Sequence, residues 1–530
     1  MANLSRTPAV KVNSAGVTFR NNTFKTKPYI APSRSTTPDA LTAKGGRGFS
    51  RTPEAELFLL AVSNFVSEES FHESAGSRDT RFASLVAQVT KSNPAFVADF
   101  VPFLRDTLNM RTASVVMAAE YVKAGGSNGR QVVASAIVRA DEPAELLAYW
   151  TKNHGRAIPQ PIKRGVADAI QRVYSERSVL KYDSKDATFR MADAIELVHP
   201  RPKAPWQSEL FKYALDRRHN RDGSYELLKL INQRDELFAM PVERRRAFLA
   251  EEGAADRLAE AGVTWEALSG WLHGPMDAVA WEAIIPSMGY MALLRNLRNF
   301  SEAGIGQSAR ALVLHKLTSE EEVAKSRQLP LRFYSAYKNV TDSEYRSALE
   351  EAVRYTLQNI PSLDGSTLVM VDTSASMNSP WSKYGKATYK EVAALFGAAL
   401  ALRNDHANLV SFDSDNRVHN TRGKTLLGLV SEIIKHSGGT NTWQAFNKHN
   451  NGQDRSVIIT DEQADYGSPR NVEEPIYTFN IGGYRVGHSA SGVGTNRVTI
   501  GGLSDNAFKA VALLEAQRQS ADSWEFLKAA

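Results

Sequence analysis

Five oxygen-bearing side chains in the second half of the chain have the types and spacing of a metal site. Asp372, Ser374 and Ser376 lie two residues apart, directly after an apolar run, and Thr440 follows two glycines. Asp461 follows a second apolar run. Hydroxyl and carboxylate oxygens suit a hard cation such as Mg²⁺. The pattern therefore predicts a divalent-cation site, with Mg²⁺ expected and Mn²⁺ or Ca²⁺ as alternatives; in the competing interpretation these side chains only cap helices.

The residue types that are missing narrow the chemistry further. The chain has no cysteine, which excludes disulfides, thiolate metal sites and thiol nucleophiles together. Gly423-Lys424-Thr425 ends like a phosphate-binding loop, but Val418 stands where that loop needs its first glycine. No set of nucleophile, base and orienting group is recognisable along the chain. We therefore predict a protein that is not an enzyme, with a metal-dependent nuclease as the least favoured alternative.

The cation ligands belong to a segment in which strands and helices alternate. Apolar runs at 365–372, 408–412, 456–460 and 475–480 predict strands, and 386–403, 424–436 and 505–518 predict helices. Such alternation is typical of a doubly wound, mostly parallel α/β sheet covered on both faces. Because ligand groups in these sheets gather at the carboxyl ends of the strands, the five side chains are expected to lie together.

The preceding 300 residues show helical periodicity instead. The expected helices span 79–92, 95–108, 112–124, 128–153, 161–176, 186–198, 204–218, 241–251, 264–272, 287–300, 305–316, 329–337 and 343–360. So many short helices cannot bury their apolar faces in one bundle, whereas stacked helix pairs can. We predict a basic arm at 1–45, an all-α HEAT-like array at 46–361 and the α/β domain at 362–530; an irregular helical domain is the alternative to the array.

Positive charge is concentrated in two parts of the chain. Residues 1–50 hold eight basic side chains against the single acid Asp39, and residues 163–221 hold thirteen against eight acids. Either segment is a candidate footprint for a polyanion. The alternative is a basic tail together with the solvated faces of a few helices.

The metal motif resembles the metal-ion-dependent adhesion site of von Willebrand factor type A domains. That family combines Asp-x-Ser-x-Ser, a later Gly-Gly-Thr and an aspartate after a strand, as in Asp372–Ser376, Gly438–Thr440 and Asp461. The resemblance implies that the five side chains bind the cation directly or through water. An acidic protein ligand at the open coordination position is then an expected partner.

Several stretches of the helical part resemble a bacterial member of the Ro autoantigen family, whose N-terminal portion is the TROVE module. They are Leu108–Ser114, Pro161–Asp168, Asp193–Lys203 and Ala292–Leu297. The resemblance implies a ring of helical repeats followed by the A domain. It also implies binding of small noncoding Y RNA on a basic outer face and of the ends of misfolded or structured RNA, including 3′ ends, in the central cavity. An exoribonuclease partner in RNA quality control, maturation or decay is implied as well.

The candidate RNA contacts fall in the stretches that carry the resemblance and in the basic window. They are Lys163, Arg164 and Arg172 on one helix, Arg190 on the next, His199, Arg201 and Lys203 in a proline-restricted loop, and Arg111 near the expected cavity. Such cations contact phosphates and set affinity and register. Tyr174, Tyr182 and Trp206 are candidates for stacking on unpaired bases, although core packing is the usual role of such side chains.

The primary hypothesis is thus a non-catalytic RNA-binding scaffold. The alternative is a metal-dependent protein-interaction or adhesion module whose helical array is only a scaffold. No apolar run approaches the ~20 residues of a membrane span, and the first residues lack a signal peptide's apolar stretch. We therefore expect a cytoplasmic monomer without membrane contact.

Overall fold

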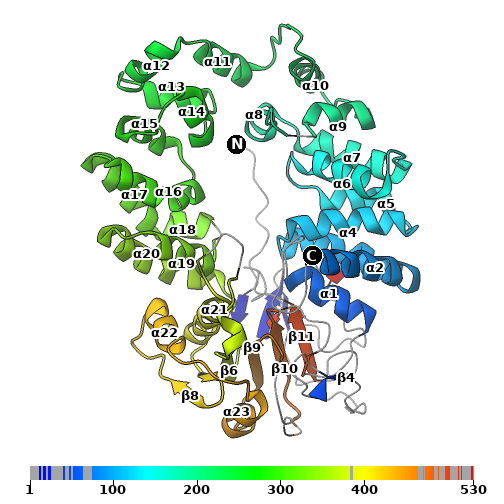
Figure 1. Ribbon diagram of the computed structural model, residues 1–530, viewed down its shortest axis with the longest axis vertical. Coiled ribbons are helices and arrows are strands. Elements are labelled where there is room, and N and C mark those ends of the chain that lie inside the picture. Colours follow the sequence, from blue (N-terminus) through cyan, green and yellow to red (C-terminus); the bar gives the residue numbers. More distant parts are fainter. Residues whose placement is uncertain are drawn as a thin grey trace. The chain divides into compact units, whose positions relative to one another are not determined.

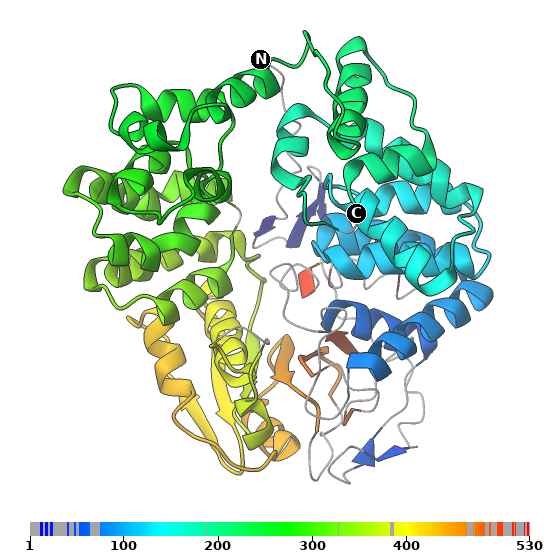
Figure 2. The same ribbon diagram turned by 45° about the horizontal axis from the view of Figure 1, so that its top comes forward.

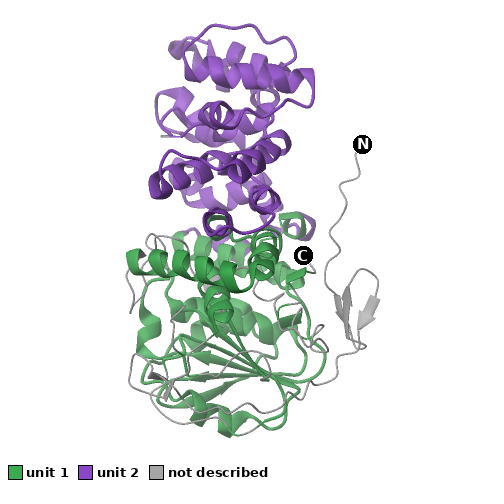
Figure 3. Ribbon diagram, turned by 90° about the vertical axis from the view of Figure 1, so that its right-hand side faces the viewer, with its two compact units in different colours: residues 1–113, 323–339, 349–530 green, residues 114–322, 340–348 purple. Residues whose placement is uncertain are grey.

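A computed structural model describes residues 52–63, 75–187, 189–326, 328–381, 386–463, 472–482 and 496–501, with isolated positions and five short strands besides. The chain forms two compact units, coloured separately in Figure 3. Unit 1 comprises residues 1–113, 323–339 and 349–530, and unit 2 comprises residues 114–322 and 340–348. These units do not follow the expected boundary at 361, because helices from both ends of the helical region pack with the sheet.

The helical region is built from short α-helices, as expected, and unit 2 holds most of them (Figures 1 and 2). The helices from residue 111 onward are α4 (Arg111–Lys123), α5 (Gly129–Ala136), α6 (Glu142–His154), α7 (Gln160–Val173), α8 (Glu176–Tyr182), α9 (Met191–Val198), α10 (Pro205–Arg218), α11 (Lys229–Phe238), α12 (Val242–Leu249), α13 (Ala254–Glu260), α14 (Trp265–Leu272), α15 (Ala278–Ile284), α16 (Tyr290–Ala303), α17 (Gln307–Thr318), α18 (Glu320–Ser326), α19 (Pro330–Asn339) and α20 (Ser343–Thr356).

The basic helix α7 is anchored through one apolar stripe. Ile162, Val166 and Ile170 recur at helical spacing and are fully buried. Between them, Gly165 lies so close to α5 that a β-carbon there would be 2.6 Å from the carbonyl oxygen of Arg130. Only glycine permits this approach, so the position of α7 against α5 is set by its sequence.

One expected helix, 128–153, is two helices in the structure. Ile137 is extended after α5, and the buried carboxylate of Glu142 accepts hydrogen bonds from the amides of Val138 (2.7 Å) and Arg139 (2.8 Å). This satisfies two amide groups of the turn that precedes α6, and it holds the change of direction between the two helices. The expectation of a continuous helix was therefore wrong.

The α/β domain of unit 1 contains a six-stranded sheet, in the order β11-β10-β9-β6-β7-β8. Its strands are β6 (Thr367–Asp372), β7 (Ala407–Phe412), β8 (Asn416–His419), β9 (Arg455–Thr460), β10 (Ile476–Asn480) and β11 (Arg497–Gly501). All neighbours are parallel except β7 and β8, which are antiparallel. The expected mostly parallel sheet is confirmed; the edge strands β8 and β11 were not expected.

Helices cover both faces of this sheet. Leu368 and Met370 of β6 belong to a core cluster with Trp443 and Phe446 of α23 (Thr442–His449). The alternate residue Val371 faces α21 (Tyr389–Arg403), where Gly397 allows the close approach. The third helix of the domain is α22 (Leu426–Ile433). The expected helix at 505–518 lies largely outside the described residues.

Helices from both ends of the helical region pack within unit 1. The N-terminal ones are α1 (Pro53–Ser63), α2 (Ala75–Ser92) and α3 (Pro94–Pro102), followed by a π-helical turn at Phe103–Thr107. The guanidinium of Arg78 on α2 donates to the carbonyl of Gly482 (3.4 Å), just after β10. From the other end, Tyr334 and Lys338 of α19 donate to the Glu391 carboxylate of α21 at 2.9 and 2.7 Å.

The first 50 residues contain short paired strands. β1 (Lys11–Asn13), β2 (Gly16–Phe19) and β3 (Asn22–Phe24) form an antiparallel sheet, and β4 (Ala40–Leu41) pairs with β5 (Arg47–Gly48). Among the described residues, no helix has the length and apolar character that crossing a bilayer requires.

Candidate metal site and nucleic-acid surface

The expected metal ligands come from loops at one edge of the sheet. β6 and β9 are parallel neighbours, with Val371 opposite Ile459. Asp372 ends β6 and Asp461 directly follows β9, so the two carboxylates emerge at the same edge. The hydroxyl of Thr460 bridges the strand ends by donating to Asp372 Oδ2 at 2.6 Å.

The Asp-x-Ser-x-Ser segment folds into a tight buried turn. Asp372 Oδ1 accepts a hydrogen bond from the amide of Ser374 at 2.8 Å, and the hydroxyls of Ser374 and Ser376 are 3.2 Å apart. A short 3₁₀ turn, Ala375–Asn378, fixes this spacing. The two hydroxyls and the carboxylate are therefore gathered in one place before any ligand binds.

The Gly-Gly-Thr loop lies beside this turn. The amide of Ala375 donates to the carbonyl of Gly438 at 2.9 Å, and the amide of Gly439 donates to Ser414 Oγ at 2.7 Å. Thr440 is fully buried, and its hydroxyl has no hydrogen-bond partner among the described residues. A buried hydroxyl without a partner is costly, so its position fits that of a ligand to a cation.

The electrostatics of the site also suit a cation. Asp372 is completely buried, and this burial together with the nearby charge of Asp461 raises the pKa of Asp372 well above its usual range. Burial lowers the pKa of Lys390, whose ammonium donates to the carbonyl of His436 at 2.9 Å. Two buried carboxylates near one partly compensating lysine would be stabilised by a divalent ion.

Sequence reasoning missed two supporting residues. Asp413 and Ser414 follow β7 at the same sheet edge, and Asp413 is almost fully buried. Its carbonyl accepts from the amide of Asn441 at 2.9 Å, while Ser414 Oγ holds Gly439. Their position directly after an expected strand was the available signal. In the described part of the chain, this site included, no three or more His, Asp or Glu side chains are grouped as a metal cluster, so the candidate site depends on hydroxyl ligands beside its carboxylates.

The expected RNA contacts of α7 form an open basic surface. Lys163 is partly exposed and Arg164 is exposed, and neither forms an ion pair with another described residue. Further along the helix, the exposed carboxylate of Asp168 pairs with Arg130 at 2.6 Å. The hydrogen bond from Arg130 lowers the pKa of Asp168, so this acid is already matched by a cation.

The loop between α9 and α10 is fixed against α7 by two glutamines. Gln171 of α7 donates to the carbonyl of Arg201 at 2.7 Å, and buried Gln207 donates to the carbonyl of Gln171 at 3.0 Å. The Gln207 side chain also accepts from the amide of Lys203 at 2.9 Å. The exposed side chains of His199, Arg201 and Lys203 therefore project from a backbone held beside the α7 cations.

Three other expected contacts have different surroundings. Arg190 is buried, and its guanidinium pairs with buried Asp183 at 2.5 Å, so it is not part of the exposed basic surface. Arg172 donates to the carbonyl of Ala134 at 2.8 Å and stabilises the end of α5. Arg111 is half-buried at the first residue of α4. The assignment of Arg190 as an RNA contact is corrected by its burial in an ion pair.

The three candidate stacking side chains also differ. Tyr174 is buried against Phe211, and burial raises the pKa of Tyr174 well above its usual range. The ring of Tyr182 lies under the guanidinium of Arg139 at 4.9 Å. Trp206 is 40% exposed, and among the described residues no other ring or cation contacts it. Of the three, Trp206 alone offers a free aromatic face.

A serine–histidine–glutamate arrangement, not foreseen in the sequence, lies in the α/β domain. His419 Nε2 is 2.8 Å from Ser411 Oγ, and His419 Nδ1 is 2.9 Å from Glu432 Oε1. The expectation that no nucleophile, base and orienting group would be found together was wrong in geometry. Ser411 is completely buried within β7, however, and a nucleophile must reach its substrate. The arrangement therefore ties the edge strand β8 to β7 and α22.

Replacing Ser411 by alanine is expected to lower the free energy of unfolding by about 1–3 kcal/mol, because a buried imidazole nitrogen loses its partner. Urea unfolding of Ser411→Ala beside the native chain measures this. The native protein should also remain unlabelled by a fluorophosphonate. Covalent labelling at Ser411 would contradict the structural role.

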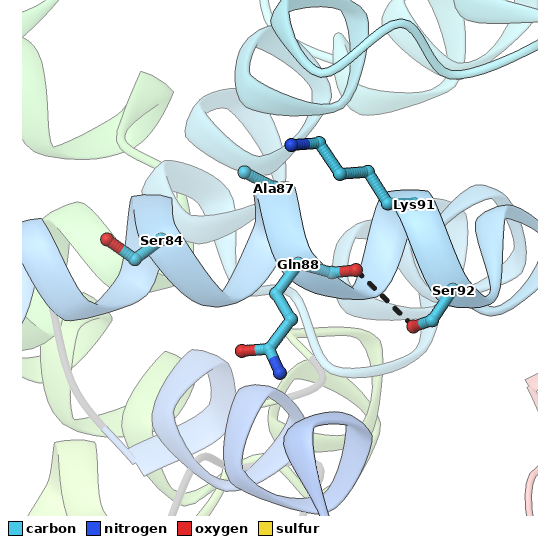
Figure 4. Close-up of a pocket in the computed structure, with 5 residues that line it drawn as sticks. All are labelled: Ser84, Ala87, Gln88, Lys91 and Ser92. Atoms are coloured by element: carbon cyan, nitrogen blue, oxygen red, sulfur yellow. Dashed lines mark hydrogen bonds between the residues drawn. The ribbon is translucent and has the colours of Figure 1, made fainter.

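One hollow on α2 offers no comparable chemistry. Its lining residues lie along one helix (Figure 4). The volume of the hollow is about 620 Å³. The hydroxyl of Ser92 donates to the carbonyl of Gln88 at 3.3 Å, so it is used within the helix. Lys91 is the one charged side chain of the lining. We assign no function to this hollow.

Comparison with known proteins finds similarity to one protein family and to two curated relatives. Residues 259–380 match the TROVE domain family, from the helical region to the first turn of the metal site. Telomerase protein component 1 of Mus musculus is 40% identical over 84 residues, and that of Rattus norvegicus is 41% identical over 80 residues. These matches cover 15% and 14% of this chain and 3% of each relative, so the chain spans a small part of the length of these proteins.

The fold has a solved counterpart. The crystal structure of the Deinococcus radiodurans Ro (RSR) protein superposes with a TM-score of 0.61 at 16% identity, covering 87% of this chain and 99% of that one. The chain therefore has the fold of that structure, with a helical array followed by a von Willebrand A-like sheet, and its residues 259–380 are similar to the TROVE domain family. The match over residues 259–380 and the shared fold agree with the resemblance to the Ro family that the sequence stretches indicate.

Proposed function

We propose that this protein is a non-catalytic scaffold that binds RNA through the basic surface of α7 and the 199–203 loop. The observation that carries the proposal is a set of solvent-accessible cations on rigid backbone, none of which forms an ion pair with another described residue: Lys163, Arg164, Arg201 and Lys203. The neighbouring acid Asp168 is already paired. A surface with this excess of positive charge attracts phosphates and releases counterions on binding.

The resemblance to the Ro family suggests which RNAs this protein binds. A small noncoding Y RNA would lie on the basic surface, and single-stranded ends of misfolded or structured RNA would enter the cavity of a ring formed by the helical array. The protein would then act in RNA quality control, maturation or decay with an exoribonuclease. The contacts of Gln171 and Gln207 support the binding of RNA on the basic surface. These neutral side chains hold the loop backbone in place and leave the charges of its cations unpaired among the described residues.

RNA that co-purifies with the protein tests the proposal. We expect a raised ratio of absorbance at 260 to that at 280 nm after purification at low salt, and a return to the protein value after a high-salt wash. Sequencing the released RNA should give one or a few small structured species. Protein that carries no RNA and binds none when total RNA is added back would contradict the proposal.

A second function is favoured by the metal site. The buried hydroxyl of Thr440 without a partner and the raised pKa of Asp372 both fit a site that holds Mg²⁺. Such an ion, held by Asp372, Ser374, Ser376, Thr440 and Asp461, would supply an open coordination position for an acidic protein ligand. This function is compatible with RNA binding by unit 2, because its residues belong to unit 1.

A further inference from the structure

The N-terminal end of α10 presents an aromatic ring beside the basic loop. Among the described residues, the large apolar side chains that are strongly exposed are five aliphatic ones and Trp206. Single exposed apolar side chains are common and need no explanation. The surroundings of Trp206 distinguish it, because Lys203 and Arg201 precede it in the same short segment.

The backbone on both sides of this tryptophan is fixed. Its neighbour Gln207 is buried and hydrogen bonds to the amide of Lys203 and to the carbonyl of Gln171. Gln171 in turn holds the carbonyl of Arg201. The backbone that carries the indole is therefore fixed by hydrogen bonds to α7 and within α10, so little conformational freedom is lost when a ligand stacks on it.

We propose that Trp206 stacks on an unpaired RNA base while Arg201 and Lys203 contact the neighbouring phosphates. An aromatic face combined with cations on one surface is the arrangement by which proteins bind unpaired nucleotides. A fully paired stem keeps its bases stacked inside and offers only phosphates and sugars. The basic surface thus distinguishes RNA with unpaired bases from uninterrupted duplex. This inference rests on the proposed function and adds a selectivity to it.

Charge favours RNA over a protein partner at this surface. The exposed carboxylate of Asp168 on α7 is paired with Arg130, and that of Glu196 on α9 is hydrogen-bonded to Nε2 of His219. The pKa of Asp168 is lowered first by the hydrogen bond from Arg130, and the charges of Lys203 and Arg172 lower it further. Cations from both the loop and α7 therefore lie near this one carboxylate, a setting that suits a polyanion.

The test compares two probes: an RNA hairpin with an unpaired loop and a blunt duplex with the same stem. Replacing Trp206 by alanine should weaken hairpin binding about tenfold and leave duplex binding unchanged, because stacking is lost and the charges remain. Trp206→Phe keeps a ring and should stay close to the native affinity. Val242→Ala, which shortens another exposed apolar side chain on α12, serves as the matched control.

The salt dependence separates stacking from charge. Trp206→Ala should leave the slope of log affinity against log salt unchanged, whereas loss of a phosphate contact reduces it by about one. The stacking role would be overturned if Trp206→Ala did not change hairpin affinity, or if it weakened hairpin and duplex binding equally. Unchanged hairpin affinity would indicate that the exposed indole contacts a protein partner and not RNA. A native protein that binds neither probe would contradict the RNA-binding function itself.

Discussion

Reversing the charges of Lys163, Arg164 and Arg201 together is expected to weaken RNA binding about a thousandfold at moderate salt. Hydrogen bonds to charged groups contribute about 1.5–3 kcal/mol each, so three lost contacts amount to at least about 4.5 kcal/mol. The slope of log affinity against log salt should also become shallower by about three. Fluorescence anisotropy with a labelled RNA hairpin, at several salt concentrations, measures both quantities.

A variant with the same change in net charge controls for long-range electrostatics. Lys229, Arg244 and Arg332 are exposed and lie outside the basic surface of α7 and the 199–203 loop. Reversing these three charges should lower affinity by less than about tenfold, since exposed charges beyond a Debye length are largely screened. Equal losses in the two triple variants would show that RNA responds only to net charge.

Mg²⁺ is expected to stabilise the native protein, by about 2.7 kcal/mol when the free ion is a hundredfold above its dissociation constant. Thermal unfolding with added Mg²⁺ and with a chelator measures the gain. Asp372→Asn should abolish it, because the site loses one of its two carboxylates. Asp415→Asn removes an exposed carboxylate from the loop that follows β7, at the same edge of the sheet. This control variant should keep the full stabilisation by Mg²⁺. Full stabilisation of Asp372→Asn by Mg²⁺ would contradict the assignment of this residue as a ligand.

In the metal-free protein, Asp372 should lower the free energy of unfolding as pH rises, whereas most acidic side chains of folded proteins raise it. The pKa of Asp372 is raised in the folded state by burial and by Asp461, so ionising this carboxyl opposes folding. The penalty is absent below the unfolded-state pKa of about 3.9 and grows as pH rises towards the folded-state value. In chelator, Asp372→Asn should therefore be more stable than the native protein at neutral pH. The difference should vanish in acid, as urea titrations across this range would show.

The positions of the candidate metal ligands were predictable because the geometry of a parallel sheet determines where the residues after each strand lie. Val369 and Val371 alternate with Leu368 and Met370 in a short apolar run, which indicates a strand buried on both faces. In a parallel sheet, the residues directly after each strand lie at one edge. Asp372 and Asp461 were therefore placed together by the sequence pattern alone.

The missed features depend on contacts between distant residues. Arg190 has the charge expected of an RNA contact, but it forms a buried ion pair with Asp183. The spacing of residues in the sequence does not distinguish a buried arginine of this kind from an exposed one. Glu142 ends an apparently continuous helical pattern by binding two amides. Ser411 and His419 meet only because β8 returns antiparallel to β7.

The most direct measurement of the RNA-binding claim is ultraviolet cross-linking of the protein to its co-purified RNA, followed by mass spectrometry of the cross-linked peptides. Cross-links are expected in the peptides that contain Lys163–Arg164 and His199–Trp206, and they should disappear in the triple charge-reversal variant. Cross-links confined to other parts of the chain, or unchanged in that variant, would contradict the account.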